Sequence, residues 1–232
     1  MAQSKRTPRA SDGEPTSVWL QPQAVRRDPL TRQRIVEVAL EVLDADGAAG
    51  LTMRRLAEAL EVGPATLYGH VRTKEDVLDL ALDEIFAEVP LPKDSGSPDQ
   101  WREELADLLR AWRSMLLDHP WSSTVLGRPQ LGPQQLAREE RLYTLLAASG
   151  LTNPEVQDTA YALSNYVIGS VLMQITWLQQ NEITRTTARE HITTHSDLYP
   201  TLSAHRNVTD TDWDRSFSSG LNTLLNGIAA PN

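Results

Sequence analysis

The 232-residue sequence contains no cysteine, and this absence excludes disulfide bonds, thiolate metal sites and cysteine nucleophiles. No apolar run approaches the roughly 20 residues that a membrane-spanning helix needs. The N-terminal segment MAQSKRTPRASDGEPTS lacks the apolar region of a secretory signal peptide. We therefore expect a cytoplasmic protein that has no membrane partner.

Motifs that carry enzyme chemistry are also missing. The sequence has no glycine-rich phosphate loop, no GxSxG nucleophile elbow and no HExxH zinc motif. His191 and His195 are four residues apart and, with Asp197 nearby, could hold a metal ion, but the spacing fixes no third ligand. We interpret them as surface histidines, and we predict a protein that is not an enzyme and needs no cofactor or metal.

The net charge of −9 is unevenly distributed along the chain. Up to Lys74 there are 11 Lys and Arg against 9 Asp and Glu, whereas the remainder has 11 against 22. A mildly basic first part is typical of a segment that faces nucleic acid, and a strongly acidic second part indicates a different role. Charge alone also permits a solvated surface whose asymmetry is accidental.

Residues 1–29 are polar and rich in proline, and their basic residues are Lys5, Arg6, Arg9, Arg26 and Arg27. We predict a flexible basic arm, whose arginines serve either solubility or insertion into a DNA minor groove. Beyond the arm, apolar residues follow a helical period, with no convincing strand and no internal repeat. Helices are expected over residues 31–47, 52–60, 64–70, 73–89, 97–116, 133–149, 154–180, 184–195 and 210–230.

The stretch from Leu51 to Val71, LTMRRLAEALEVGPATLYGHV, predicts two short helices joined by a tight turn. In such a unit the first helix braces the DNA backbone and the second lies in the major groove. The residues expected to form the small core between the helices are Leu56, Ala57, Leu60, Val62 and Leu67. On the opposite face of the second helix, Thr66 can bond a base edge or a phosphate, and the Tyr68 hydroxyl can reach a phosphate.

This part of the sequence, LTMRRLAEAL followed by VGPATLYGHVRTKEDVLDL, resembles the TetR family of bacterial regulators over residues 31–89. The resemblance implies that Tyr68 and Lys74 clamp phosphates. It also implies base or backbone contacts from Arg54, Pro64, Ala65, Thr66, Gly69 and His70. Two positions depart from the family pattern. Glu61 stands where a glycine is common, which predicts a left-handed residue with slight strain, and Gly69 replaces a bulky aromatic residue.

A weaker resemblance extends through DHP at Asp118, GPQQL at Gly132 and YALSNYVIGSVL at Tyr161. The predicted fold class is therefore all-α. It comprises an N-terminal three-helix helix-turn-helix DNA-binding domain over residues 30–76 and a larger helical ligand-binding and dimerisation domain over residues 77–232. Residues 90–97 are expected to form a linker and residues 120–132 a loop or broken helix. Ser97 to Gln100 are expected to open a helix as a cap, a first-turn proline and a capping-box glutamine.

Two helices of the second part carry strong apolar stripes. The helix from Pro154 is apolar on two faces, one with Ala160, Leu163, Val167 and Val171, the other with Tyr161, Ile168, Leu172 and Ile175. Burial on both sides fits either a deep position in one chain or contact with a second chain. The resemblance implies that this helix and the last one form a four-helix bundle in a homodimer. A two-fold dimer would match palindromic, double-stranded operator DNA.

The remaining helices should enclose a pocket for a small-molecule inducer. Its expected lining mixes aromatic, soft and polar side chains: Trp112, Met115, His119, Trp121, Arg128, Arg138, Asn165, Tyr166, Met173, Gln174 and Trp177. Tetracycline repressors hold their drug through magnesium, a histidine and a carboxylate. At the position of that carboxylate this chain has Met173, so we expect instead a largely apolar or aromatic antibiotic or secondary metabolite.

These features predict a ligand-responsive repressor that controls an efflux or biosynthetic gene. In this hypothesis, ligand binding shifts the helix that starts at Thr73 and moves the two recognition helices out of register with the DNA. One alternative is an activator or pleiotropic regulator of the same fold that has no inducer. Another is a small-molecule-binding or enzymatic helical protein whose helix-turn-helix is incidental.

Overall fold

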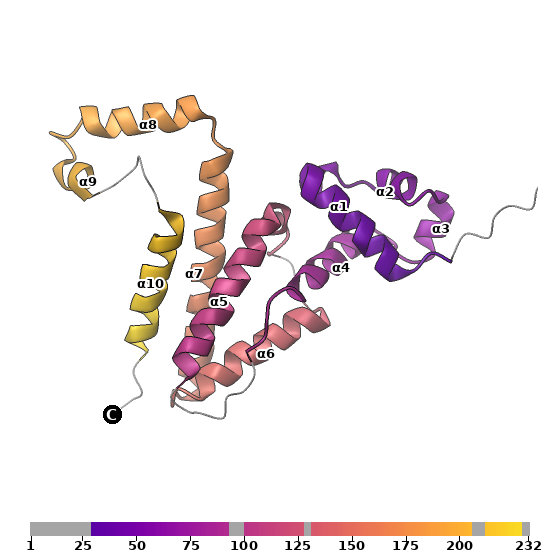
Figure 1. Cartoon of the computed structure of the whole chain (residues 1–232), viewed down its shortest axis with the longest axis horizontal. Coiled ribbons are helices and arrows are strands. Elements are labelled where there is room, and N and C mark those ends of the chain that lie inside the picture. The colour runs from indigo at the N-terminus through magenta and orange to yellow at the C-terminus, as the bar shows by residue number, and fades with distance from the viewer. Residues whose placement is uncertain (1–28, 93–99, 128–130, 206–211, 229–232) are drawn as a thin grey trace, which may run out of the picture. The chain divides into compact units, whose positions relative to one another are not determined.

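The computed structural model describes residues 29–92, 100–127, 131–205 and 212–228, and within these ranges it contains helices and no strand (Figure 1). The all-α fold class is thus confirmed. The predicted basic arm lies almost wholly outside the described residues, as does Arg128. No described helix is both long and apolar enough to cross a membrane.

The first four helices are α1 (Arg32–Gly50), α2 (Met53–Ala59), α3 (Pro64–Tyr68) and α4 (Lys74–Phe86). Their starts follow the cap residues. The side chains of Thr31, Thr52 and Thr73 accept hydrogen bonds from backbone N–H groups in the first turns of α1, α2 and α4. Asp76 completes a capping box at the start of α4 by accepting from the Thr73 N–H. Gly47 leaves helical geometry at φ 69°, at the point where the sequence predicts the first helix to end.

The core beneath the helix-turn-helix is formed by α1, α2, α3 and α4. Leu56, Ala57 and Leu67 are buried as expected, whereas Leu60 and Val62 are half-buried. α1 contributes a buried stripe that packs against α4, and its members are Ile35, Val36, Val38, Ala39, Val42 and Leu43. This packing fixes where α3 lies, because a five-residue helix is too short to be stable by itself.

The second part contains α5 (Trp101–Asp118), the 3₁₀ helix η2 (Pro120–Thr124), α6 (Pro133–Ala147), α7 (Asn153–Gln179), α8 (Glu182–Thr194), α9 (Pro200–His205) and α10 (Trp213–Gly227). The expected cap of α5 is wrong, because Gln100 is itself the N-cap and makes no side-chain cap hydrogen bond. α8 starts at Glu182, where Asn181 caps it. α9 has no counterpart among the helices expected from the sequence.

Helix α4 connects the helix-turn-helix to the second part, since it contacts α1 on one side and α5 and α6 on the other. η2 also contacts α1. α7 packs against α5, α6 and α10, and α7 and α10 run side by side (Figure 1). One face of α7 is buried in this packing, with Ala160, Leu163, Val167 and Val171. On its other face Tyr161 is 72% exposed and Leu172 39% exposed.

Candidate DNA-binding and ligand-binding sites

Helix α3 exposes the residues that the sequence predicts to contact DNA. Leu67 is fully buried and anchors the helix, whereas Pro64, Ala65, Thr66, Gly69 and His70 are exposed. Tyr68 is 52% exposed, which is unusual for a large aromatic side chain. The hydroxyl and methyl groups on this face are of the kind that contact phosphates and base edges.

The turn before α3 depends on Glu61. This residue adopts φ 54°, the one non-glycine residue with positive φ among those described. The chain reverses there while the Val62 N–H donates to the Ala57 carbonyl at 3.0 Å. The left-handed conformation expected at this position is therefore present, and it sets the angle at which α3 leaves α2.

The basic residues near α3 differ in their freedom to reach DNA. The Arg54 side chain is 88% exposed and its Nε donates to Glu58 at 2.8 Å. Arg55 instead bonds within the protein, to Asp46 and to the Gly50 carbonyl. Lys74 is half-buried, and its Nζ donates to the Ala48 carbonyl at 2.6 Å, so it ties the start of α4 to the end of α1. An ammonium has three donors, so this contact leaves Lys74 two for a phosphate.

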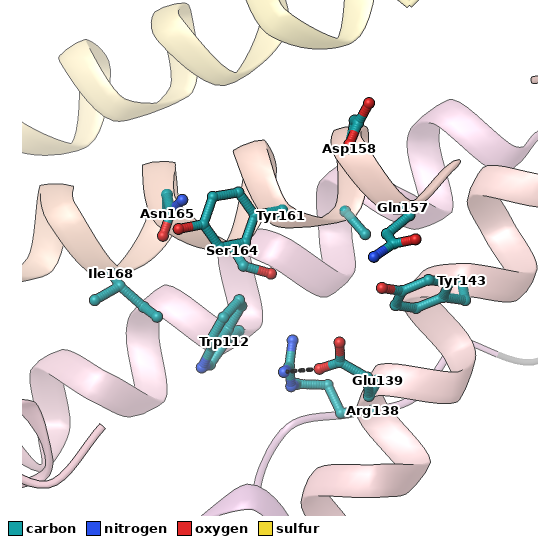
Figure 2. Close-up of a pocket in the computed structure, with 11 residues that line it drawn as sticks. Trp112, Arg138, Glu139, Tyr143, Gln157, Asp158, Tyr161, Ser164, Asn165 and Ile168 are labelled. Carbon is teal, nitrogen blue, oxygen red and sulfur yellow. Dashed lines mark hydrogen bonds and ion pairs between the residues drawn. The ribbon is translucent and has the colours of Figure 1, made fainter. Parts of the chain in front are cut away.

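A cavity of about 470 Å³ lies between α5, α6 and α7 (Figure 2). It contains three of the residues expected to bind ligand, namely Trp112, Arg138 and Asn165. Its other lining residues were not predicted: Glu139, Tyr143, Gln157, Asp158, Ala160, Tyr161, Ser164 and Ile168. Tyr161, Ser164, Asn165 and Ile168 follow the three- and four-residue spacing of one helix face, which is a signal that could have found them.

The polar residues Tyr166 and Gln174 were expected in the pocket but serve packing between helices. The Tyr166 hydroxyl donates to the Phe217 carbonyl at 2.9 Å, and the two rings stack with centroids 5.2 Å apart. Gln174 accepts a hydrogen bond at 2.6 Å from Arg113, which also pairs with Asp214 at 2.7 Å. These contacts join α5 and α7 to α10.

Other expected pocket residues do not line this cavity either. Met115 is buried in the core, Met173 is 68% exposed and Trp177 is half-buried. His119 and Trp121 lie at the junction with α1, where both hydrogen-bond to the Asp44 carboxylate at 2.7 Å. These two residues were expected to line the pocket. They instead form a polar contact between the two parts of the protein.

Arg138 is the most unusual residue of the cavity. It is 3% exposed, and its guanidinium lies 3.8 Å from the centroid of the Trp112 ring. Figure 2 shows it between that ring and Glu139, whose carboxylate accepts a hydrogen bond from Nη2 at 2.9 Å. Burial of the guanidinium outweighs the attraction of Glu139 and lowers the pKa of Arg138 from its usual value.

In the part of the chain that the structure describes, no three His, Asp or Glu side chains are grouped so that they could hold a metal ion. The rings of His191 on α8 and His195 at its C-cap lie 4.3 Å apart, and His195 Nδ1 is 2.7 Å from the His191 carbonyl oxygen.

A helix-turn-helix with an exposed second helix, joined to a helical part that contains a cavity, defines a DNA-binding regulator with a ligand-binding domain. Residues 35–81 match the model of the tetR family of bacterial regulatory proteins, and residues 91–231 match the tetracyclin repressor-like C-terminal domain. The chain belongs to the TetR family of transcriptional regulators.

Similar proteins include regulators of Saccharopolyspora and Streptomyces. An HTH-type transcriptional regulator of Saccharopolyspora erythraea is 42% identical and covers 95% of this chain and 94% of its own. The HTH-type transcriptional repressor DrrR1 of Streptomyces coeruleorubidus is 32% identical over 86% of this chain and 77% of its own. The structure of Streptomyces coelicolor ActR in complex with actinorhodin matches with a TM-score of 0.77 at 32% identity, covering 86% and 97% of the two chains.

Proposed function

We propose that this protein is a homodimeric repressor that binds a palindromic operator and is released from it by a small aromatic molecule, an antibiotic or other secondary metabolite. Residues 30–76 bind DNA, residues 77–232 bind ligand and dimerise, and residues 1–29 form a basic arm. The gene under control encodes efflux or biosynthesis of the ligand. The observation that carries the proposal is the exposed α3 face, which is connected through α4 to helices that line a cavity.

The exposed residues of the helix-turn-helix support operator binding. Tyr68 and Thr66 supply hydroxyl groups, and Arg54 supplies a charge that Glu58 holds at the surface of α2. Phosphate contacts give affinity and register, whereas base contacts give sequence preference. Gly69 adds no side chain to this surface, so Thr66, Ala65 and Pro64 carry the base reading.

The free apolar surface of α7 and α10 supports dimerisation. Leu172 is 39% exposed on α7, and Leu224 is 39% exposed on α10. Between these helices lies a further, more open cavity of about 550 Å³ that includes Leu163, Leu224 and Ile228 in its lining. A second copy packed on this surface would bury these side chains and place two α3 helices in two-fold symmetry.

The cavity between α5, α6 and α7 supports a small-molecule inducer. Its volume of about 470 Å³ is within the range of ligand pockets, and its lining combines Trp and Tyr rings with polar groups. ActR, which shares the fold, was solved with actinorhodin. A multi-ring aromatic ligand therefore fits both the size and the chemistry of this cavity.

The path from the cavity to the DNA runs through α6 and α4. Asp83 of α4 accepts hydrogen bonds from the backbone N–H groups of Gln134 and Gln135 at 3.0 and 3.1 Å, so it caps the first turn of α6. A Cβ built on Gly132 would overlap Asp83, so this close approach requires glycine. A ligand that moves α6 therefore pulls on α4, and coupling of about 1–3 kcal/mol would reduce operator affinity about 5- to 150-fold.

Gel-shift binding to DNA fragments that flank the protein's own gene, at fixed salt, tests this function. We expect Tyr68→Ala to weaken sequence-selective binding by about tenfold or more, because a hydrogen bond to a charged phosphate is lost. Tyr68→Phe separates the hydroxyl from the ring. Tyr199→Ala is the matched control, since Tyr199 is 50% exposed and lies outside the helix-turn-helix.

Reversal of the wild-type gel shift by aromatic secondary metabolites would support the proposal that such a molecule is the inducer. Absence of selective binding to any of the flanking fragments would contradict local autoregulation. Equal loss of binding in Tyr68→Ala and Tyr199→Ala would contradict the assignment of α3 as the recognition helix.

A further inference from the structure

Arg138 is a buried cation that the protein itself only partly satisfies. Its guanidinium is packed over the Trp112 ring at 3.8 Å and faces the Phe86 ring at 5.4 Å. These two rings and the position on α6 hold it in place at 3% exposure. Cation–π contacts of this kind stabilise the charge but accept no conventional hydrogen bond.

The hydrogen-bond donors of this group are mostly unused. Nη2 donates to Glu139. Among the residues that the structure describes, Nε and Nη1 of Arg138 have no acceptor, and neither has the buried Nε1 of Trp112. A buried donor without an acceptor loses its hydration and gains nothing in exchange, so such groups are rare in native proteins. Both residues line the same cavity, so a ligand that displaces the side chains covering these atoms would supply the missing acceptors.

The two carboxylates near the cavity do not fully neutralise the charge of Arg138. Glu139 is 46% exposed at its side chain and occupies one nitrogen of the guanidinium. Asp158 is exposed. Water screens both carboxylates more strongly than it screens the buried guanidinium. Burial lowers the pKa of Arg138 despite the opposing attraction of Glu139, yet arginine stays protonated in proteins.

We propose that the ligand of this cavity is an aromatic acid, whose anionic oxygen group accepts hydrogen bonds from Arg138 while its ring system lies among Tyr143, Tyr161 and Ile168. The proposal rests on the proposed ligand-responsive function and specifies its ligand class. An oxygen anion satisfies the guanidinium donors and neutralises the charge, and a planar ring system is suited to the aromatic side chains that line the cavity in Figure 2. A neutral aromatic molecule of the same size would fill the space and leave the charge unpaired.

One arrangement within the protein competes with this proposal. Gln135 is 4% exposed, lies one turn before Arg138 on α6, and its Oε1 has no partner among the described residues. A rotamer change that brought this oxygen to Arg138 would satisfy one donor without a ligand. The cavity would then show no preference for an anion. Comparing a charged with a neutral ligand therefore distinguishes a Gln135–Arg138 hydrogen bond from an anion-binding site.

The test measures binding to the full-length protein by isothermal titration calorimetry, without DNA, using anthraquinone-2-carboxylate and its neutral carboxamide. The two probes have nearly the same size and rings and differ in charge. We expect the wild type to prefer the carboxylate by at least about tenfold, because each hydrogen bond between charged groups outweighs its neutral counterpart. Arg138→Gln should abolish this preference and leave carboxamide affinity within about twofold of the wild type. Arg141→Gln, on the same helix but outside the cavity lining, should retain it.

Loss of the preference in Arg138→Gln together with its retention in Arg141→Gln would support the assignment. Equal binding of the two probes by wild type, binding of neither, or a preference that survives Arg138→Gln would overturn it. The wild-type comparison needs no variant, so it decides even where Arg138→Gln fails to fold. Operator release by an uncharged aromatic molecule would leave the repressor function standing while the acid assignment fails.

Discussion

His119 Nδ1 lies 2.7 Å from Oδ1 of Asp44, and Trp121 donates its indole N–H to the same oxygen at 2.7 Å. The other ring nitrogen of His119, Nε2, is 3.3 Å from Glu88. The His119 imidazole, directly after α5, thus contacts both α1 and the residues that follow α4. This polar contact joins the DNA-binding helices to the ligand-binding part at a second place, separate from the contact between Asp83 and α6.

We expect the stability of this contact to depend on pH. Partial burial of the ring opposes its charge, but the hydrogen bonds and the attraction of Asp44 and Glu88 outweigh that effect, so the pKa of His119 is raised. A raised pKa in the folded state stabilises the protein fully below the unfolded pKa, and this stabilisation is lost as pH rises through the folded value. We therefore expect the free energy of unfolding of the wild type to exceed that of His119→Gln by more at about pH 6 than at about pH 8.5.

Urea denaturation of both proteins at several pH values would measure this difference. His195→Gln is the matched control, because His195 is half-buried at the C-cap of α8, where its Nδ1 lies near the His191 carbonyl oxygen and not near a carboxylate of the described residues. A difference that stays constant with pH, or grows as pH rises, would contradict a charged His119 in the folded protein.

Glu61 carries the left-handed conformation of the turn between α2 and α3. Left-handed geometry costs a non-glycine residue roughly 1–2 kcal/mol, and glycine avoids this cost while losing roughly 0.5–1 kcal/mol of chain entropy. We predict that Glu61→Gly raises the free energy of unfolding by up to about 1 kcal/mol. Chemical denaturation measures the change.

Glu58→Gly provides the comparison for Glu61→Gly, because Glu58 is helical and pairs with Arg54. It should lower the free energy of unfolding by about 1 kcal/mol. The same sign for the two substitutions would show that the strain at Glu61 is negligible or is offset by contacts of its side chain.

Gly220 and Tyr166 set how closely α10 approaches α7. A Cβ built on Gly220 would overlap the Tyr166 hydroxyl oxygen, and the stacking on Phe217 restricts how far that ring can move. We predict that Gly220→Ala destabilises the wild type by about 1–3 kcal/mol, as overpacking does elsewhere. In a Tyr166→Phe background the cost should be smaller, since the overlapping atom is absent.

A double-mutant cycle in urea measures this interaction between the two positions. Tyr166→Phe alone should cost about 1 kcal/mol, because it removes the hydrogen bond to the Phe217 carbonyl and keeps the ring. Additive effects of the two substitutions would mean that α10 shifts to relieve the overlap, and the close approach would then not be fixed by this pair.

Short-range chemistry made the helix-turn-helix predictable from the sequence. Thr31, Thr52 and Thr73 cap helices through bonds to residues three positions away, and Glu61 stands at a turn whose geometry two helices impose. The burial of Leu67 and the exposure of Thr66 and Tyr68 follow from the period of one short helix. These features depend on neighbours along the chain, so reading the chain in order recovers them.

Which residues line the cavity depends on contacts between segments that are distant in the sequence. Arg138 and Asn165 line it, whereas Gln174 and Tyr166, of equally suitable chemistry, are engaged by Arg113 and Phe217. Periodicity shows that a residue faces inward but not which helix it meets. The sequence alone thus determined the all-α class, the caps of α1, α2 and α4, and which side chains of α3 are exposed. Tertiary packing decided which polar groups were paired across helices and which, like the Nε and Nη1 atoms of Arg138, remain without a partner among the described residues.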